Sequence, residues 1–409
     1  MRLKDSPTEA AFRAGLRAWL VEAVVAVPLE PDPADWASRR RYDTAWQRRL
    51  FEAGYAGTNW PAEFGGRGAS AAQQLIALEE LQRAGAPDLG VNFVGMLHAG
   101  PTLFTEGTPA QRAAHLPAIL CGEEVWCQGF SEPGAGSDLA SLQTRAVRDG
   151  DDYVVNGQKI WTSWGHVADY CELLVRTDDA APKHKGITWL ILPMNTPGVE
   201  VRPLVTATGS TEFCELFLDD VRIPAANRVG AENDGWRVSM VTFGFERGGA
   251  IVTEMMRSRT MLADLVRVAR LVRRGTGSAF DDPGVRRQLG HLVAEFDALW
   301  AQARRNVAAA TPTGVEVYSG SVFKIRYAEA LHGLSELTFE LLGRSGLTFD
   351  GLASDDIGDR VGDRPTGRLV EHAVWALSVS ISAGTSQIQR NIVAERILGL
   401  PREPVWTSR

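Results

Sequence analysis

The chain has 409 residues, of which 44% are hydrophobic and 23% are charged, a composition typical of a globular protein with room for two or three domains. Its formal net charge of −7 leaves no domain-sized excess of lysine and arginine, which excludes a general binder of nucleic acid or of anionic membranes. No apolar run reaches 18 residues, so the sequence predicts no membrane span.

The first third of the chain is predicted to be helical. Its N-terminal segment has apolar residues spaced four apart and interrupted by charges, as in an amphipathic helix and unlike a signal peptide, which favours a cytoplasmic protein. The apolar residues of this segment are Phe12, Leu16, Leu20 and Val24. Residues 44–54, 70–85 and 108–122 repeat the helical spacing between capping residues and glycines. We expect an α-helical domain over residues 1–121.

The period changes in the middle of the chain. The pair Asn156-Gly157 is a hairpin signal, and it stands in the strand-like segment "DYVVNGQKIWTS". Further candidate strands follow at "CELLVRT", "GITWLILPM", "GVEVRPL" and "CELFLDDVRIP". The sequence therefore predicts a β-barrel-like domain over residues 122–234.

The helical period returns at Gly235 and continues to the end of the chain. The apolar segments over residues 235–274, 285–307 and 319–343 are long enough for a helical bundle. A polar stretch rich in glycine and aspartate, residues 348–367, predicts a loop before the last helical run. The predicted fold is α+β, mostly α, with a third domain over residues 235–409 that forms a four-helix bundle.

Several common motifs are absent or incomplete. Gly66, Gly68 and Ala71 match a G-x-G-x-x-A pattern, but no buried strand precedes them, so a dinucleotide-binding turn is disfavoured. The four cysteines are scattered without a C-x-x-C pair or a nearby histidine cluster, which predicts buried thiols in place of a metal site or a disulfide framework.

The segment "CQGFSEPGAGSDLAS", residues 127–141, is a candidate ligand loop. Gly134 and Gly136 would let backbone N–H groups approach an anionic ligand, and Ser131 and Ser137 offer hydroxyl partners. Taken alone, the segment is more typical of a solvated glycine- and serine-rich loop, and its surroundings favour the ligand loop.

A second candidate segment, "NGQKIWTSWGH", follows about 20 residues later and places Trp161 and Ser163 on the strand that leaves the predicted hairpin. An aromatic ring beside a hydroxyl suits a flat heteroaromatic ligand, which needs one covered face and a few hydrogen bonds at its edge. The alternative is a tryptophan that simply covers the sheet.

Taken together and in order, the motifs "WPAEFGG", "SEPGAGSD", "NGQKIWTS" and "GTSQIQRNIVAERILGLPRE" resemble the acyl-CoA dehydrogenase family over essentially the whole chain. The resemblance implies a flavoprotein oxidoreductase of lipid metabolism, as in β-oxidation, that binds FAD between a helical, a β and a helical domain. It also implies an acyl-CoA substrate, an electron-transfer flavoprotein or similar acceptor, and a homodimer or homotetramer.

The resemblance also implies roles for single residues. Gln128 and Ser131 match positions that meet the flavin ring, and Gly136 lies in the same FAD-binding loop. Ser137 matches a position near the pyrophosphate and the CoA, and Trp161 with Ser163 matches the pair beside the flavin. Thr385 and Gln387 match positions that hold the FAD of the neighbouring subunit.

The position of the catalytic base departs from the family pattern. The family removes the α proton of an acyl thioester with a carboxylate while a hydride leaves the β carbon for flavin N5. In many members the base is a glutamate directly before "GTSQIQR", and here that position is Ala383. Alanine has no side chain that accepts a proton, but Ala383 keeps its backbone N–H. The resemblance implies that this N–H donates to the thioester carbonyl.

A second location for the base exists in the family, on the first long helix of the C-terminal domain. This chain has "TFGFERGGA" there, and the apolar surroundings of Glu246 would raise the pKa of its carboxyl toward that of a general base. Glu246 is therefore the candidate base. Arg247 is a candidate to orient it or to approach the CoA, with a structural ion pair as the alternative.

Two further departures bear on assembly. The chain has "RRGTGSAFDDPGVRRQLG" where many relatives carry an Arg-x-x-Phe-Gly motif that reaches the neighbour's FAD. Glu340, Gly343 and Arg344 replace an expected glutamine and glycine pair. Such departures resemble a subgroup that handles bulky substrates and works as heterotetramers of active and inactive subunits.

Three hypotheses follow. The first is an acyl-CoA dehydrogenase that makes a 2,3-enoyl-CoA with Glu246 as base. The second is a non-catalytic partner subunit of an active homologue. The third is another flavin-dependent oxidation or hydroxylation on the same fold. The acyl group stays open, because Met96, His98 and Trp164 are candidates to line its pocket and are as readily explained by packing.

Overall fold

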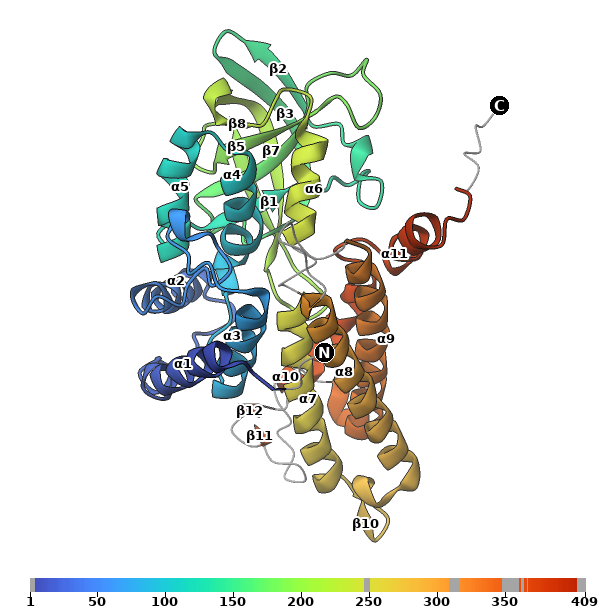
Figure 1. Cartoon of the computed structure of the whole chain (residues 1–409). Helices are drawn as coiled ribbons and strands as arrows, with labels where there is room; N and C mark the ends of the chain where they lie inside the picture. Colours follow the sequence, from blue (N-terminus) through green and yellow to red (C-terminus); the bar gives the residue numbers. More distant parts are fainter. Residues whose placement is uncertain are drawn as a thin grey trace, which may run out of the picture. The chain divides into compact units, whose positions relative to one another are not determined.

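The computed structural model describes residues 4–245, 251–308, 317–347, 360–361, 364–365 and 367–402. The chain forms two compact units, one of residues Arg2–Gly249 and one that comprises Ala250–Arg409. The first holds helices and a large sheet, and the second is helical with two short hairpins (Figure 1).

The helices of the first unit begin where the sequence supplies capping residues. Ser6, Ser70 and Thr108 each accept a bond from the backbone three residues on, and the side chain at that position returns a bond to the cap. The longer helices are α1 (Pro7–Val25), α2 (Trp36–Glu52), α3 (Ala71–Ala84), α4 (Gly100–Glu106), α5 (Pro109–Cys121) and α6 (Gly235–Phe245).

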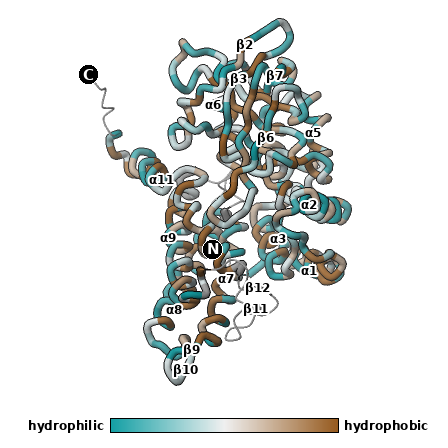
Figure 2. Tube along the Cα trace, turned by 180° about the vertical axis from the view of Figure 1, so that it is seen from behind, coloured by the Kyte–Doolittle hydropathy of each residue, from teal (hydrophilic) through white to brown (hydrophobic). Residues whose placement is uncertain are grey.

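The predicted amphipathic N-terminal helix is confirmed. Phe12, Leu16 and Leu20 are buried on one face of α1. Helix α2 is polar over most of its length, as its colouring in Figure 2 shows, and buries a short apolar face that includes Trp46 and Leu50. Each helix therefore contributes one narrow apolar stripe to a shared core.

The middle of the chain forms one sheet with the strand order β6-β7-β3-β2-β4-β5-β8, and β1 pairs in parallel with β4. The strands are β1 (Trp126–Gly129), β2 (Arg145–Asp149), β3 (Asp152–Ser163), β4 (Tyr170–Arg176), β5 (Ile187–Pro193), β6 (Val199–Leu204), β7 (Phe213–Pro224) and β8 (Arg228–Val229). The four strands predicted after the Asn156-Gly157 segment are confirmed as β4 to β7.

Both faces of this sheet are covered. Leu174 and Trp189 lie in the core that the sheet shares with the helices, whereas their neighbours Leu173 and Leu190 lie in a second core on the opposite face. Successive side chains of a strand point to opposite faces, so β4 and β5 need apolar residues on both faces to fill both cores. This explains why both strands are mostly apolar, with Glu172 and Arg176 as the charged exceptions in β4.

The hairpin predicted at Asn156-Gly157 is wrong. Strand β3 runs through this pair, and the chain turns earlier, where Asp149 pairs with Asp152 and Gly150 takes a φ of +61°. The ladder between β3 and β7 shifts register at Gly157, where a Cβ atom would lie 2.7 Å from the Cα of Thr144. Gly157 is required where β3 passes close to Thr144, the residue before β2, and not for a turn.

The second unit contains α7 (Ile251–Leu271), α8 (Pro283–Ala308), α9 (Val317–Leu342), α10 (Gly367–Ala376) and α11 (Ser386–Ile392). Helices α7, α8 and α9 pack side by side, and α9 also contacts α10 and α11 (Figure 1). The short strands β9 (Arg273–Arg274) and β10 (Gly277–Ser278) form a hairpin between α7 and α8, and β11 (Arg360–Val361) pairs with β12 (Arg364–Pro365).

The order of helical, β and helical segments confirms the predicted fold class. The exact domain boundaries stay predictions. Helix α6, which begins at the predicted boundary, packs against α4 and β5 of the first unit, and the hydroxyls of Thr102 and Thr242 are 2.8 Å apart there. Most of the loop predicted over residues 348–367 lies outside the described residues. None of the helices that the structure describes is long and apolar enough to cross a bilayer.

Candidate functional site

The candidate ligand loop after β1 is fastened to strand β3 by a buried ion pair. The Lys159 ammonium lies 2.8 Å from Glu132 Oε1 and also donates to the carbonyl of Phe130. The Glu132 carboxylate further accepts the backbone N–H groups of Gln143 and Thr144. Lys159 is fully buried, so this pair closes the base of the loop without access to water.

Glu132 and Lys159 are both charged in this arrangement. Burial would raise the pKa of the Glu132 carboxyl, but the charge and hydrogen bond of Lys159, together with the backbone donors, hold it below its usual range. Burial acts in the opposite sense on Lys159 and lowers the pKa of its ammonium. We conclude that the pair is ionised at neutral pH, because each charge is compensated by the other.

The tip of the same loop is open. Gly136 and Ser137 are exposed, and a Cβ atom built on Gly134 or Gly136 would meet nothing within 4 Å. Glycine is therefore not required there by contacts within the described part of the chain, and the space beside its backbone is free for an anionic ligand. The predicted residues Ser131 and Ser137 belong to this loop, and Gln128 is half-buried on the strand that leads into it.

Strand β3 carries the predicted Trp161 in a strained conformation. Its φ is +62°, at a register shift between Lys159 and Thr162, and its indole is 58% exposed. A bulky residue in this region of φ is uncommon and costs roughly 1–3 kcal/mol. The exposed ring stands edge-to-face with Phe213, with the centroids 5.9 Å apart. This geometry leaves a large part of the ring available to a ligand.

The ligand loop and strand β3 are held together at the predicted residues. The N–H of Ile160 donates to the carbonyl of Ser131 over 3.0 Å, so the backbone before Trp161 is tied to the loop. Within the described part of the chain, the hydroxyls of Ser131 and Ser163 form no hydrogen bond. The structure thus joins the loop that carries Ser131 to the strand that carries Trp161 and Ser163. The hydroxyls of both serines are left to bind a ligand.

A buried polar cluster lies at strand β1, which leads into the loop. Gln128 donates to Oε1 of Glu172 over 2.8 Å and lies 3.2 Å from Nδ1 of His98. His98 belongs to a π-helical turn, Gly95–Ala99, a form of helix that is frequent at functional sites. Sequence analysis missed Glu172, because it stands in a run of apolar strand residues and only the pairing of β1 with β4 places it beside Gln128.

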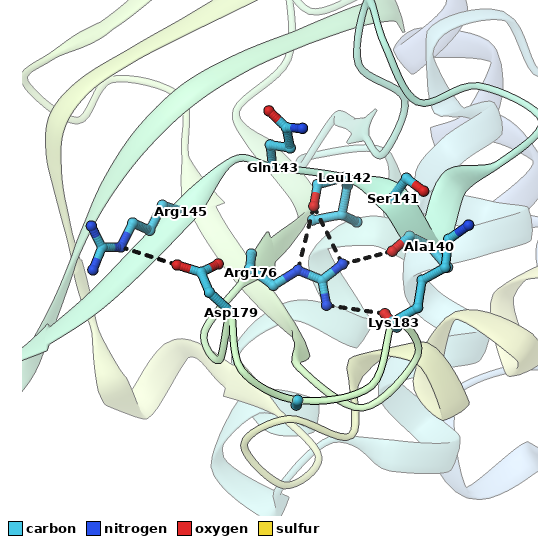
Figure 3. A pocket seen from close by; sticks show the side chains of 9 residues that line it. Ala140, Ser141, Leu142, Gln143, Arg145, Arg176, Asp179 and Lys183 are labelled. Carbon is cyan, nitrogen blue, oxygen red and sulfur yellow. Dashed lines mark hydrogen bonds and ion pairs between the residues drawn. The ribbon is translucent and has the colours of Figure 1, made fainter. Parts of the chain in front are cut away.

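A surface pocket of about 530 Å³ opens beside the candidate loop (Figure 3). The Arg176 guanidinium donates hydrogen bonds to the backbone carbonyls of Ala140, Leu142 and Lys183. Arg145 and Lys183 are exposed cations at the pocket, paired with Asp179 and Asp138 respectively. The pocket is thus lined by ion-paired cations, and Lys183 reaches Asp138, the residue that follows the predicted Ser137 in the sequence.

The predicted Ala383 lies in a tight turn of the second unit. Ala383 has a φ of +51° and Gly384 a φ of +82°. Thr385 caps α11, since its hydroxyl accepts the N–H of Ile388 over 3.1 Å, and Gln387 is exposed on that helix. The Thr385 hydroxyl, predicted to contact FAD, therefore already accepts a capping hydrogen bond from its own helix.

Two of the predicted site residues, Glu246 and Arg247, lie outside the described residues. Of the departures from the family pattern, Glu340 lies 3.1 Å from both Arg274 Nη2 and Gln288 Nε2 in the second unit. That carboxylate therefore joins the hairpin after α7 to helices α8 and α9.

All four cysteines are buried and free, as predicted for thiols without a structural bridge. Burial raises the pKa of Cys127 and Cys214, the latter to about 11, so these thiols are protonated and unreactive at neutral pH. The described residues hold no group of three or more histidine, cysteine or acidic side chains that could bind a metal ion.

Known proteins share the order of a helical, a β and a helical domain along the whole chain. The N-terminal, middle and C-terminal domains of acyl-CoA dehydrogenases match residues 6–123, 127–221 and 233–398. The acyl-CoA dehydrogenase IpdE1 of Mycobacterium tuberculosis (strain ATCC 25618 / H37Rv) is 39% identical over 402 residues, which cover 96% of this chain and 98% of that protein.

Two solved structures are similar as well. The ChsE4–ChsE5 complex from Mycobacterium tuberculosis has a chain that is 32% identical, with a TM-score of 0.82 and coverage of 98% of this chain and 100% of that one. The Tcur3481–Tcur3483 steroid ACAD is 30% identical, with a TM-score of 0.80 and the same coverage of both chains. Since the three domain matches follow one another over most of its length, the chain belongs to the acyl-CoA dehydrogenase family.

Proposed function

We propose that this protein binds FAD and dehydrogenates an acyl-CoA thioester between its α and β carbons, giving the 2,3-enoyl-CoA. The observation that carries the proposal is the open loop of Gly136 and Ser137 joined to the exposed, strained Trp161, in a chain of this family. Bound FAD would supply the acceptor, at N5, for the hydride that leaves the β carbon.

The FAD-binding part of the proposal rests on the geometry of the first unit. The exposed Trp161 ring offers a flat face, and Ser131 and Ser163 offer hydroxyls that the described residues leave uncommitted. Backbone N–H groups at the tip of the loop suit the pyrophosphate, because no side chain fills the space beside Gly136. These residues fit a flavin dinucleotide in the roles that the family resemblance implies.

The acid–base part assigns two roles to different groups. Glu246 takes the α proton of the thioester, because Ala383 has no side chain that accepts one. The Ala383 N–H donates to the thioester carbonyl and stabilises the negative charge that develops on its oxygen as the α proton leaves. Proton removal and charge stabilisation are then supplied by separate residues.

The sharpest test of the base uses anaerobic mixing with a panel of acyl-CoAs, followed by loss of the visible flavin absorbance. We expect Glu246→Gln to slow flavin reduction at least about 100-fold while FAD stays bound, because general-base catalysis contributes roughly 10²–10⁴-fold. The double variant Glu246→Gln/Ala383→Glu should regain reduction, since it returns a carboxylate to the usual family position.

A conservative variant and a measurement of FAD content control for effects of Glu246→Gln other than loss of the base. Glu246→Asp retains a carboxylate and should keep more activity than Glu246→Gln. The FAD content of each variant, read after release of the cofactor, must match that of the wild type. Equal reduction rates for wild type and Glu246→Gln would show that Glu246 is not the base.

The substrate class that we propose is a bulky, polycyclic acyl-CoA. The support is the 30% identical structure named as a steroid ACAD, together with the family departures at Glu340, Gly343 and Arg344. For the CoA moiety we propose the pocket of Arg145 and Lys183, whose cations suit phosphate groups, since Lys183 pairs with Asp138, the residue after Ser137. Competition between a polycyclic and a straight-chain acyl-CoA in the bleaching assay tests the acyl preference.

A second candidate function is a non-catalytic partner subunit of a heteromeric dehydrogenase. It is favoured by Ala383 and by the name of the ChsE4–ChsE5 structure, which is a complex of two proteins. The variant Ala383→Glu distinguishes the two functions. If the wild type binds FAD and never bleaches with any acyl-CoA, whereas Ala383→Glu does, the partner role is supported. Mass measurement of the purified chain then reports whether it assembles alone.

A further inference from the structure

The turn that carries Ala383 is a strained element that needs support. A φ of +51° at alanine costs roughly 1–3 kcal/mol relative to its preferred conformations, and the following Gly384, at +82°, is free to adopt others. A turn of this composition does not hold a single orientation by itself. Its neighbours in the second unit therefore decide where the Ala383 N–H points.

Two buried donors from different helices bind the carbonyl groups of this turn. The Lys324 ammonium, on α9, donates to the Gly384 carbonyl over 2.7 Å. The Gln389 side chain, on α11, donates to the carbonyl of Ala383 over 3.1 Å and approaches that of Gly384 at 3.4 Å. Lys324 is 2% exposed and Gln389 is fully buried, so water does not compete for these bonds.

A lysine is a costly residue at such a position. Burying an ammonium loses several kcal/mol of hydration, and a methionine would fill a similar volume without that loss. Toward this turn, the lysine supplies a charge-assisted hydrogen bond, which is shorter and about twice as strong as a neutral one. The bond ends on a backbone carbonyl of the turn, so it restrains the backbone there.

We propose that Lys324 and Gln389 are positioning residues, which hold the Ala383–Gly384 turn so that the Ala383 N–H stays aimed at the thioester carbonyl. The inference rests on the proposed function of this N–H as the donor to the developing oxyanion. Because the two residues bind the carbonyls of Ala383 and Gly384, the backbone on the C-terminal side of Ala383 cannot shift without breaking a buried bond. Such a shift would move the Cα atom of Ala383 and, with it, the N–H group attached there, and a hydrogen bond weakens steeply below about 120°.

The test compares Lys324→Met and Gln389→Leu with a matched control on the same helix. The control is Ser335→Ala, which removes a buried hydrogen bond of 2.8 Å from α9 to the carbonyl of Ala373 and leaves the turn untouched. Lys324→Arg serves as the conservative variant, since it restores a charged donor. Each protein is purified with FAD, and its FAD content and thermal midpoint are recorded first.

Two readouts separate positioning from simple structural support. The first is the limiting rate of flavin reduction at saturating acyl-CoA, set against the dissociation constant of the same ligand. The second is the infrared carbonyl stretch of a bound, isotope-labelled acyl-CoA, which falls when a donor polarises the thioester. The second readout needs no turnover.

We expect Lys324→Met to lower the limiting rate about 10- to 100-fold, less than the roughly 10²–10³-fold that follows loss of an oxyanion donor. The dissociation constant should change less than about threefold, and the carbonyl stretch should move toward that of free acyl-CoA. Gln389→Leu should shift both readouts in the same direction, Ser335→Ala should leave them unchanged, and Lys324→Arg should recover part of the rate.

The inference is overturned if Lys324→Met and Gln389→Leu retain FAD and show the rate and carbonyl stretch of Ser335→Ala. If Lys324→Met does not fold, Gln389→Leu alone decides, because it removes the Gln389 bonds to the same turn without changing any charge. A wild-type protein that neither reduces its flavin nor shifts the carbonyl stretch would instead overturn the proposed function, on which the inference rests.

Discussion

Backbone strain is concentrated in the predicted site segments. Five non-glycine residues of the described structure have a positive φ, and two of them, Asp220 and Asn233, are of types that tolerate it. The other three are Trp161 and Trp164, in the segment "NGQKIWTSWGH", and Ala383, directly before "GTSQIQR". Strain of this kind persists only where the surroundings enforce it, which explains the buried ties of Lys159 and Lys324 to these segments.

The ion pair under the ligand loop gives a residue-scale prediction. Lys159→Met should lower the free energy of unfolding by about 3–5 kcal/mol, because it leaves the Glu132 carboxylate buried without its countercharge. The double variant Lys159→Met/Glu132→Gln should recover part of the loss. Urea unfolding of the FAD-loaded and FAD-free proteins measures both, and we expect the single variant to lose FAD more readily.

A matched control exists on the same loop. Lys183 pairs with Asp138 at the surface, so Lys183→Met should cost no more than about 1 kcal/mol. If Lys159→Met is as stable as Lys183→Met, the buried pair does not hold the loop as argued.

At the scale of elements, α9 organises the second unit. It packs against α7, α8, α10 and α11 and carries both Lys324 and Tyr327. Tyr327 meets the hydroxyl of Ser258 on α7, and that hydroxyl lies 3.5 Å from Nε2 of His372 on α10. Three helices therefore converge on one buried polar contact, and its histidine is a titratable group in the helical core.

This contact predicts an acid-sensitive second unit. Burial, with a smaller effect from the charge of Arg257, lowers the pKa of His372 from 6.5 to about 4. The unfolded chain then binds a proton at higher pH than the folded one, so stability is full above pH ~6.5 and falls as the pH drops toward 4. The shift corresponds to a loss on the order of 3 kcal/mol.

The measurement is the urea midpoint of the second unit at pH 5 and pH 7, followed by fluorescence and circular dichroism. The variant His372→Phe has no imidazole to protonate, so its midpoint should depend less on pH over this interval. His291, 73% exposed at its side chain, provides the control variant His291→Phe, which should behave as the wild type. An unchanged pH dependence in His372→Phe would contradict the assignment.

At the scale of the whole molecule, the fold was largely predictable and the site only in part. Helices such as α1 and α3 followed from apolar spacing and capping residues, and β4 to β7 from apolar runs. The hairpin at Asn156-Gly157 was mispredicted, because a strand that must pass close to Thr144 requires a glycine for the same steric reason as a turn. Local sequence does not distinguish these two demands.

The site residues illustrate the same limit. Trp161 and Ser131 could be proposed as site residues because their motifs are contiguous. The contacts of Glu132 with Lys159 and of Lys324 with Gly384 instead span 27 and 60 residues. A single charged residue within an apolar helix face, as at Lys324, is the only sequence signal for such a contact. It does not name the partner, which tertiary packing alone decides.

The most direct test of the proposed activity is an anaerobic incubation of the purified wild-type chain, loaded with FAD, with a polycyclic acyl-CoA, followed by mass analysis of the thioester. We predict bleached flavin and a product lighter by two hydrogens, formed in an amount equal to the FAD present. An FAD-loaded chain that binds the acyl-CoA and returns it unchanged would contradict the proposal that this chain is itself a dehydrogenase.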